Sequence, residues 1–107
     1  MRKIKYIVLH CSATKEGVPF GIEDIDRWHR QRGFRKVGYH YVILLDGTIS
    51  KGRDIAKVGA HVQGSNANSI GICYIGGLDA DGKPKDTRTE EQKASLFFLP
   101  VSYTHLT

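Results

Sequence analysis

The sequence predicts a single α/β domain in which a mixed central β-sheet is flanked by helices. Three observations support this fold class. Short apolar runs rich in β-branched residues alternate with one clear amphipathic helix, and a hairpin signal joins two of these runs. The 107 residues, 40% of them hydrophobic, are enough for one core but not for two domains. The expected order is strand, helix, three strands and a second helix.

The first expected strand is the Ile-Val-Leu run at 7–9, which is followed at once by His10 and by small polar residues. Two of the three apolar residues are β-branched, which is typical of a buried strand. A histidine at the exit of a strand lies at the rim of the sheet, where sites of α/β proteins tend to lie. Its imidazole could bind a metal, transfer a proton or hydrogen-bond a neighbour, and a lone histidine here is more often structural.

Residues 22–33 carry the pattern of an amphipathic helix. Four side chains fall on one face: Ile22, Ile25, Trp28 and His29. Acidic residues lie in the first turn and basic residues in the last, which suits the helix dipole. Gly33 fits the position just after the C-terminal end.

Two further strands and a hairpin follow. Residues 39–45 are expected to form a strand, and the Asp-Gly turn at 46–47 brings residues 48–51 back antiparallel to it. Residues 70–75 form another long apolar run, which the Gly-Gly pair at 76–77 ends. The hairpin is the clearest local signal in the sequence.

A second helix is expected near residue 90, because Thr89 and Gln92 have the spacing of a capping box. The amphipathic pattern of this helix is lost soon after its start. Residues 96–99 are apolar on every side, Pro100 is expected to end the helix, and residues 101–107 read as strand-like. Residues 96–107 therefore look unrelated to the sequence that precedes them.

Cys11 and Cys73 each lie in or just after an apolar run. A disulfide is not expected in a reducing compartment. Both are expected to be small core residues rather than nucleophiles.

The net charge is +5, from 16 Lys and Arg against 11 Asp and Glu. Such a surface favours anionic partners, although an ordinary solvated surface explains it more simply. No nucleic-acid partner is expected, because no recognition motif or aromatic-basic platform occurs. No apolar run approaches the ~20 residues that a membrane span needs. The run at 7–9 is too short for a signal peptide, so synthesis in the cytoplasm is expected.

Several short motifs follow one another in the order of a known family. They are 8–14 (Val-Leu-His-Cys-Ser-Ala-Thr), 28–29, 37–43, 46–48, 52–54, 58–61, 68–72 and 76–77. Together they resemble the zinc N-acetylmuramoyl-L-alanine amidases of the phage-lysozyme type, which are related in fold to the peptidoglycan recognition proteins. The resemblance covers about residues 4–93. Each motif alone is weak, but their unbroken order is specific.

The resemblance implies a peptidoglycan hydrolase, such as the endolysin of a phage or prophage, whose partner is the bacterial cell wall. Members of the family bind one Zn²⁺ through two histidines and a third ligand, with water in the fourth place. They cleave the amide between N-acetylmuramic acid and the L-alanine of the stem peptide. His10 aligns with the first histidine ligand. Tyr39 aligns with the tyrosine that assists the zinc-bound water and the developing oxyanion.

The other histidines receive different assignments. His61 lies in a loop that could border the groove and contact the glycan or peptide, or could simply be solvated. His29 is expected to be a packed, hydrogen-bonded residue of the helix. His40 points opposite to Tyr39 by strand alternation, so it is assigned to structure. Arg53 is expected to pair with one of two nearby aspartates or with an acid of the substrate.

The sequence departs from the family after residue 93. We assign residues 1–93 to an incomplete, C-terminally truncated amidase domain and residues 94–107 to a divergent tail, expected from a truncated or frame-shifted reading. The remaining zinc ligands are not recognisable, and His105 is interpreted as a coincidence because the intervening helix would be only about 15 Å long. One histidine cannot hold Zn²⁺. The chain is thus expected to be an N-acetylmuramoyl-L-alanine amidase by resemblance, with its activity left open by the two missing zinc ligands, or alternatively a non-catalytic module of the same fold that binds peptidoglycan or another partner.

Overall fold

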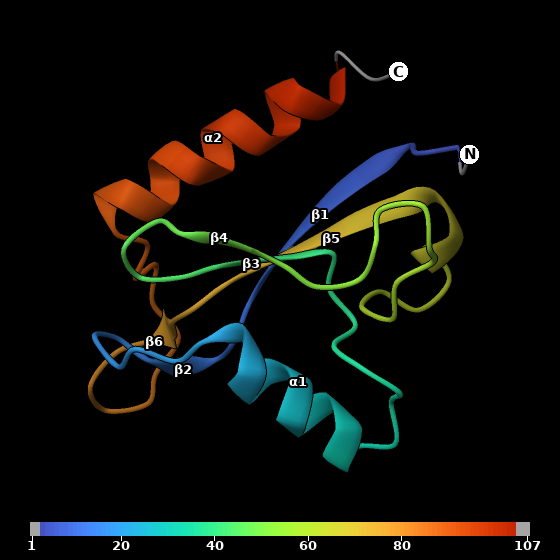
Figure 1. Cartoon of the computed structure of the whole chain (residues 1–107). Helices are drawn as coiled ribbons and strands as arrows, with labels where there is room; N and C mark the ends of the chain where they lie inside the picture. Colours follow the sequence, from blue (N-terminus) through green and yellow to red (C-terminus); the bar gives the residue numbers. More distant parts are fainter. Residues whose placement is uncertain (1–2, 105–107) are drawn as a thin grey trace.

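The structure, a computed structural model, describes residues 3–104, with side chains placed for residues 3–99. A central sheet is covered by helix α1 on one face and helix α2 on the other (Figure 1). The elements are β1 (Tyr6–Cys11), β2 (Thr14–Lys15), α1 (Ile22–Gln31), β3 (Tyr41–Ile43), β4 (Ile49–Lys51), the 3-10 turn η1 (Asn66–Asn68), β5 (Ser69–Tyr74), β6 (Gly77–Leu78) and α2 (Glu90–Thr104). The expected α/β fold with a mixed sheet is confirmed.

The central sheet has the strand order β1-β5-β3-β4. Strand β5 pairs in parallel with both β1 and β3, whereas β3 and β4 form an antiparallel hairpin. Strands β2 and β6 form a separate parallel pair. Every residue of β5 is buried. This is expected of a central parallel strand that is covered on both faces.

Two hydrophobic clusters lie on the two faces of the sheet. The cluster below α2 contains Ile43, Ile70, Ile72, Tyr74 and Leu99. The cluster below α1 contains Ile25, Val37, Val42, Cys73 and Ile75. Side chains alternate between the faces along β5, so one strand supplies both clusters. The core therefore depends on β5 more than on any other strand of the sheet.

Helix α1 forms as its pattern predicts. The backbone N–H of Gly21 donates to Oδ2 of Asp24 at 2.8 Å, which satisfies a free donor at the start of the helix. After the helix, Gly33 has a φ of +95°, a conformation that glycine adopts without strain. Ile25 and His29 are buried against the sheet, as expected for the apolar face.

The hairpin between β3 and β4 is also confirmed. Gly47 has a φ of +88°, as the Asp-Gly turn requires. The N–H of Leu44 donates to the carbonyl of Thr48 at 2.9 Å, and the N–H of Thr48 donates to Oδ1 of Asp46 at 2.9 Å. The strand itself is shorter than expected, because Tyr39 precedes it and Leu44 already belongs to the turn.

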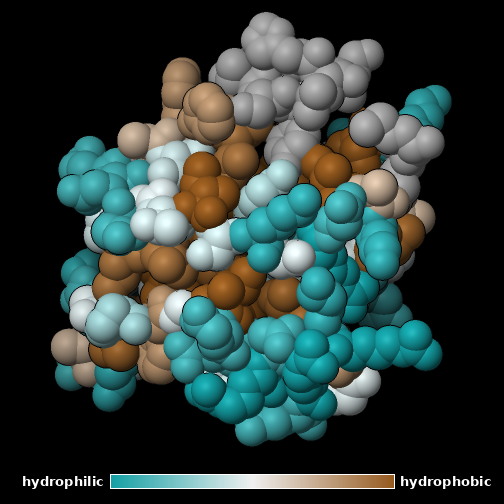
Figure 2. Space-filling model, in the orientation of Figure 1, coloured by the Kyte–Doolittle hydropathy of each residue, from teal (hydrophilic) through white to brown (hydrophobic). Residues whose placement is uncertain are grey.

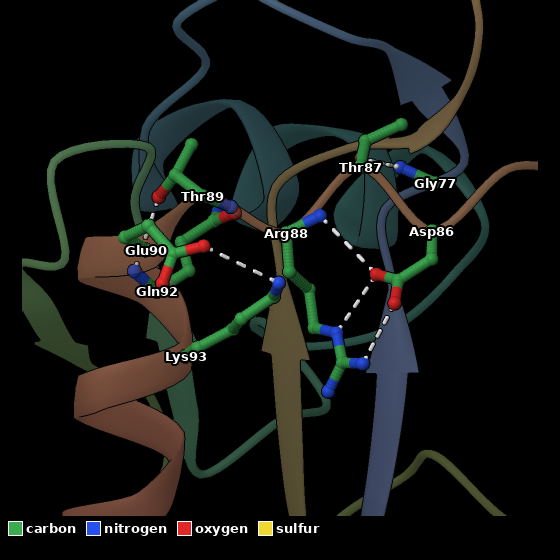
Figure 3. A network of polar contacts seen from close by, with 8 residues as sticks. All are labelled: Gly77, Asp86, Thr87, Arg88, Thr89, Glu90, Gln92 and Lys93. Carbon is green, nitrogen blue, oxygen red and sulfur yellow. Dashed lines mark hydrogen bonds and ion pairs between the residues drawn. The ribbon is translucent and has the colours of Figure 1, made fainter.

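The predicted capping box opens α2 (Figure 3). The N–H of Thr89 donates to Oε1 of Gln92 at 2.9 Å, and the N–H of Gln92 donates to Oγ1 of Thr89 at 3.0 Å. The Gln92 side chain is fully buried. Its Nε2 also donates to the carbonyls of Ile43 and Ile75 at 3.3 and 3.0 Å. One side chain thus caps the helix and joins it to β3 and to the residue that follows β5.

Replacing Gln92 with alanine is expected to lower the free energy of unfolding by about 1–3 kcal/mol, because two buried carbonyls and the half-buried N–H of Thr89 each lose a hydrogen bond. Urea unfolding of both proteins measures this loss. Gln31→Ala is the matched control, since Gln31 is exposed at the end of α1. Equal losses in the two variants would contradict the role given to Gln92.

The end of α2 differs from the expectation. The helix continues through Pro100 to Thr104, so the predicted stop and the strand-like interpretation of residues 101–104 are wrong. A proline inside a helix removes one backbone hydrogen bond and crowds the carbonyl four residues before it, but its φ is compatible with helical backbone. The assigned boundary at residue 93 falls inside this helix and stays a prediction. His105 lies outside the described residues.

The apolar stretch within α2 is divided between core and solvent. Leu99 is buried, with 5% of its surface exposed, and packs in the cluster below α2. Phe97 and Phe98 are 78% and 62% exposed. Figure 2 shows apolar side chains across the middle of this face, over the sheet, and hydrophilic side chains below them, where α1 lies in Figure 1. No helix of residues 3–104 has the length and apolar character needed to cross a bilayer.

The two cysteines differ in their surroundings. Cys73 is fully buried in the cluster below α1, as expected. Cys11 is exposed, so its assignment to the core is wrong. The reason is topological, because Cys11 ends the edge strand β1, whereas Cys73 lies on the central strand. Both thiols are free.

Candidate functional site

His10 lies one residue before the end of β1, on the face of the sheet that α1 covers. It is paired in register with Cys73 of β5, and Cys73 belongs to the cluster below α1. Residues paired across neighbouring strands point to the same face of a sheet. The fold therefore directs the imidazole of His10 towards the α1 side, at the edge of the sheet.

The loop between β4 and η1 brings His61 against His10. Nε2 of His10 lies 2.9 Å from Nδ1 of His61, and the two rings meet edge to face at an angle of 84°. One of these nitrogens carries the hydrogen and the other accepts it, so the two tautomers are linked. Burial lowers the pKa of His10, which favours the neutral imidazole that such a pair requires. Two of the three predicted site residues are thus in direct contact.

Tyr39 completes the group. Its ring centroid lies 5.2 Å from that of His10 and 6.4 Å from that of His61. Burial raises the pKa of Tyr39 well above its usual range, with a further contribution from the Cys73 thiol beside it. The side chain therefore keeps its O–H at neutral pH and can act as a hydrogen-bond donor. His10, Tyr39 and His61 form what we call the His-Tyr cluster.

His61 is held from several sides. Oδ1 of Asn66 accepts hydrogen bonds from the N–H groups of His61 and Val62, both at 2.9 Å. Nε2 of His61 lies 3.2 Å from Oγ of Ser69. Gly71 leaves the space that the ring fills, since a Cβ there would lie 2.5 Å from Cγ of His61. These residues act together to fix the ring against His10.

Asn66 and Gly71 also belong to the site, although neither was predicted from the sequence. Residues 68–72 contributed to the predictions only as one motif of the family resemblance. One signal was present, because Gly71 interrupts the otherwise apolar run at 70–75. A glycine inside a strand often marks a place where another group approaches the backbone closely. Here the approaching group is the imidazole of His61.

His29 and His40 are structural, as expected. The N–H of Gly38 donates to Nδ1 of His29 at 2.8 Å. The N–H of Gly71 donates to Nδ1 of His40 at 3.0 Å, and Nε2 of His40 donates to the carbonyl of Lys57 at 2.8 Å. Both rings accept at Nδ1, so both are neutral in the folded protein. They hold the segment before β3 and thereby position Tyr39.

The stability of the fold is expected to decrease as the pH falls below about 6.5, where unfolded histidine begins to bind protons. Burial lowers the pKa of His29, and the nearby charges of Arg32 and Arg53 lower it further. The unfolded chain therefore binds the proton first, and stability is lost as the pH falls towards the pKa of the folded state. Urea unfolding between about pH 7.5 and about pH 5.5 measures this loss. His29→Gln should flatten the dependence, and an unchanged profile would contradict it.

Among the described residues, Arg53 forms no ion pair with Asp46 or Asp54. Its Nε donates to the carbonyl of Val37, and its Nη1 donates to the carbonyl of Val58, both at 2.9 Å. Asp54 pairs instead with Lys51 at 3.7 Å. The expected pairing of Arg53 with an aspartate is therefore wrong, because two backbone carbonyls bind its guanidinium. Its pairing with an acid of the substrate stays a prediction. Arg53 thus joins the segment before β3 to the loop after β4.

A cleft of about 530 Å³ opens beside the His-Tyr cluster. The side chains and backbone that line it come from the end of α1, from the segment before β3 and from the loop after β4. The main lining residues are His29, Arg32, Phe34, Tyr39, His61 and Asn66. A ligand in this cleft would therefore touch two members of the cluster directly.

The described residues contain no complete metal site. Among them, no group of three His, Cys, Asp or Glu side chains is arranged to hold a metal ion. A catalytic zinc needs three protein ligands and a water. Burial raises the pKa of the Cys73 thiol to about 12, so this thiol is protonated at neutral pH. His10 and His61 are the two imidazoles that the fold brings together at this edge.

Comparison with known proteins agrees with this architecture. The family model described as N-acetylmuramoyl-L-alanine amidase matches residues 1–99. The endolysin of Klebsiella phage KP32 is 44% identical over 102 residues, which cover 92% of this chain and 68% of the endolysin. The endolysin of Escherichia phage T7 is 46% identical over 96 residues, which cover 90% of this chain and 64% of that protein. The chain thus spans about two thirds of the length of these relatives.

Among solved structures, the amidase LysC from Clostridium intestinale superimposes with a TM-score of 0.83 at 32% identity. The match covers 97% of this chain and 64% of LysC. Both the sequence match and the shared fold extend over nearly all of this chain. The chain therefore belongs to the N-acetylmuramoyl-L-alanine amidase family.

Proposed function

We propose that the chain carries the substrate cleft and one metal ligand of a peptidoglycan hydrolase. The reaction is hydrolysis of the amide between N-acetylmuramic acid and the L-alanine of the stem peptide. The observation that supports it most is the convergence of His10, Tyr39 and His61 beside one cleft. The proposed partner is bacterial peptidoglycan, reached after synthesis in the cytoplasm.

His10 is the proposed ligand of one Zn²⁺. When bound, this ion supplies an activated water and polarises the scissile carbonyl. The described residues contain no group of three ligands, so at least one further ligand of the proposed site lies outside them. His61 holds the ring of His10 through the 2.9 Å contact, so it selects the tautomer and orientation of the ligand.

Tyr39 is the proposed donor to the oxyanion that forms on the scissile carbonyl. Burial keeps its hydroxyl protonated, and the rings of His10 and His29 lie on either side of its own ring, each with its centroid 5.2 Å away. A donor held in this way stabilises the developing charge without having to reorganise. His61, which lines the same cleft, is proposed to contact the glycan or the peptide as well.

A second candidate function is a non-catalytic module that binds peptidoglycan through the same cleft. The absence of a three-ligand group from the described residues favours it. This module would bind the same substrate as the hydrolase but would hold no zinc ion. Zinc content therefore separates the two functions more sharply than binding does.

The test combines metal analysis with an assay on purified peptidoglycan. The hydrolase should contain near-stoichiometric zinc and release peptides with new L-alanine amino termini. A chelator and His10→Ala should both abolish release, whereas Cys11→Ala, which changes the exposed neighbour, should not. Zinc-free protein that binds peptidoglycan without cleaving it would support the binding module. Protein that neither binds nor cleaves would contradict both functions.

A further inference from the structure

A second cleft, of about 280 Å³, gathers positive charge on the surface of the protein. Its described lining residues are Arg35, Lys36, Arg53, Asp54, Lys57 and Val58. Four of these side chains are cationic and one is acidic, so the lining carries a formal charge of +3. None of these residues lines the cleft beside the His-Tyr cluster. This second cleft, which we call the basic cleft, is therefore a separate feature of the surface.

The positive charges of the basic cleft lack acidic partners. Within the described part of the chain, none of its four cationic side chains forms an ion pair. Arg27 of helix α1, by contrast, pairs with Asp24 at 2.8 Å. Asp54, the one acid of the lining, is exposed and pairs at 3.7 Å with Lys51, which does not line the cleft. Like charges held together destabilise a fold by mutual repulsion, which a bound anion would relieve.

Arg53 gives the basic cleft a fixed hydrogen-bond donor. Its Nε donates to the carbonyl of Val37, and its Nη1 donates to the carbonyl of Val58, both at 2.9 Å. A guanidinium carries five N–H donors in one plane, so further donors remain for a ligand or for water. Because the side chain is already held in place, it loses little conformational freedom when an anion binds.

The loop that carries Arg53 and Lys57 is held by hydrogen bonds at several points. The N–H of Ala56 donates to Oδ1 of Asp54, and the N–H of Lys57 donates to the carbonyl of Asp54, both at 2.9 Å. The carbonyl of Lys57 accepts a hydrogen bond from Nε2 of His40 at 2.8 Å. The backbone on this side of the cleft is thus ordered before a ligand arrives, which lowers the cost of binding.

The lining of the basic cleft favours a phosphate group among the possible anions. Arginine binds phosphate with two parallel hydrogen bonds, and lysine binds it as a point charge. A phosphate group also has more charge and more acceptor oxygens than a carboxylate, so it can meet several cations at once. The cleft volume is several times the roughly 30 Å³ that one water molecule occupies, which leaves room for a diphosphate.

The same lining disfavours two larger anionic partners. None of the described lining residues is aromatic, so the basic cleft offers no surface on which the bases of a nucleic acid could stack. Val58 is the single apolar side chain among them, which is too little to enter the acyl region of a membrane. A small soluble molecule therefore fits the basic cleft better than a polymer or a lipid surface.

We propose that the basic cleft is a binding site for the phosphate group of a small soluble molecule, such as a diphosphate or a phosphorylated sugar. The fixed guanidinium of Arg53 binds two of the phosphate oxygens, and the three exposed cationic side chains neutralise the remaining charge. The bound group links the segment before β3 to the loop after β4. The site goes beyond the proposed hydrolysis and does not depend on it, since the two clefts share no lining residue.

The test is a titration of the full chain with inorganic diphosphate at neutral pH and constant ionic strength, followed by NMR. Saturable shifts are expected at the backbone amides of residues 35–36 and 53–58. Arg35→Gln/Lys57→Gln removes two exposed cations of the lining and should weaken binding at least about tenfold.

The double variant Lys15→Gln/Lys83→Gln is the matched control. It removes the same net charge from two exposed lysines that do not line the basic cleft, and it should bind diphosphate as the wild type does. Equal weakening in both double variants would overturn the proposal, because net charge alone would then attract the anion.

Two further results would also overturn the proposal. One is the absence of saturable shifts in the wild type. The other is co-sedimentation with phosphatidylglycerol vesicles without any binding of diphosphate, which would assign the basic cleft to a membrane surface. Cleavage of peptidoglycan by the Arg35→Gln/Lys57→Gln variant is a separate measurement. Its result bears on the proposed function alone, because these two residues lie outside the cleft of the His-Tyr cluster.

Discussion

Replacing Gly71 with alanine is expected to push His61 away from His10 and to destabilise the fold. The new Cβ would lie 2.5 Å from the Cγ and Cδ2 atoms of the His61 ring. Strand β5 cannot move aside, because it is paired with β1 and β3. Overpacking of this kind costs about 1–3 kcal/mol or more, which urea unfolding measures. The histidine ring signals in NMR spectra report the displacement of His61.

The double variant Gly71→Ala/His61→Ala is the control for this prediction. Removing the imidazole removes the atoms that the new methyl group meets, so much of the lost stability should return. Two residues in direct contact are expected to show such coupling, whereas independent effects would add. If the losses of stability in the two single variants simply add in the double variant, the proposed packing of His61 against Gly71 of β5 is contradicted.

The second large effect is expected at the hydroxyl of Tyr39. Tyr39→Phe should lower the rate of amide hydrolysis about 10²–10³-fold, which is the loss usually caused by removing one oxyanion donor. The ring contacts with His10 and His29 do not involve the hydroxyl, so the fold should persist. Release of new L-alanine amino termini from peptidoglycan measures the rate, and co-sedimentation with peptidoglycan measures binding.

Tyr41→Phe is the matched control. Tyr41 packs against the cluster below α2, on the other face of the sheet from the His-Tyr cluster. Its loss of a hydroxyl should leave the rate nearly unchanged. Equal rates for wild type and Tyr39→Phe would contradict the oxyanion role. Loss of binding along with activity would assign Tyr39 to substrate positioning instead.

The elements predicted best are those with signals inside a few neighbouring residues. The helix at α1, the Asp-Gly hairpin and the capping box of Thr89 and Gln92 all depend on local chemistry, and the structure confirms each one. The end of α2 was predicted less well. Pro100 was expected to end the helix, whereas the helix continues to Thr104.

The site was harder to predict, because its contacts join distant parts of the chain. His10 and His61 are 51 positions apart, and no local pattern links them. The resemblance to a family drew attention to His10 and Tyr39 but left His61 with two open interpretations. Its contact with His10 depends on Asn66, Ser69 and Gly71, whose roles follow only from the packing of the loop on β5.

The order of the strands has a consequence for how the chain folds. Strand β5 pairs with both β1 and β3, yet it follows all other strands of the central sheet in the sequence. During synthesis, the β3–β4 hairpin is the one pairing of this sheet that can form before β5 emerges. Long-range parallel pairing is slow, so β1 stays unpaired until β5 emerges. Ile7 and Leu9, expected in a buried strand, remain 37% and 45% exposed on this edge strand even in the folded chain. Formation of the sheet, and with it of the site at His10, is therefore governed by the arrival of β5.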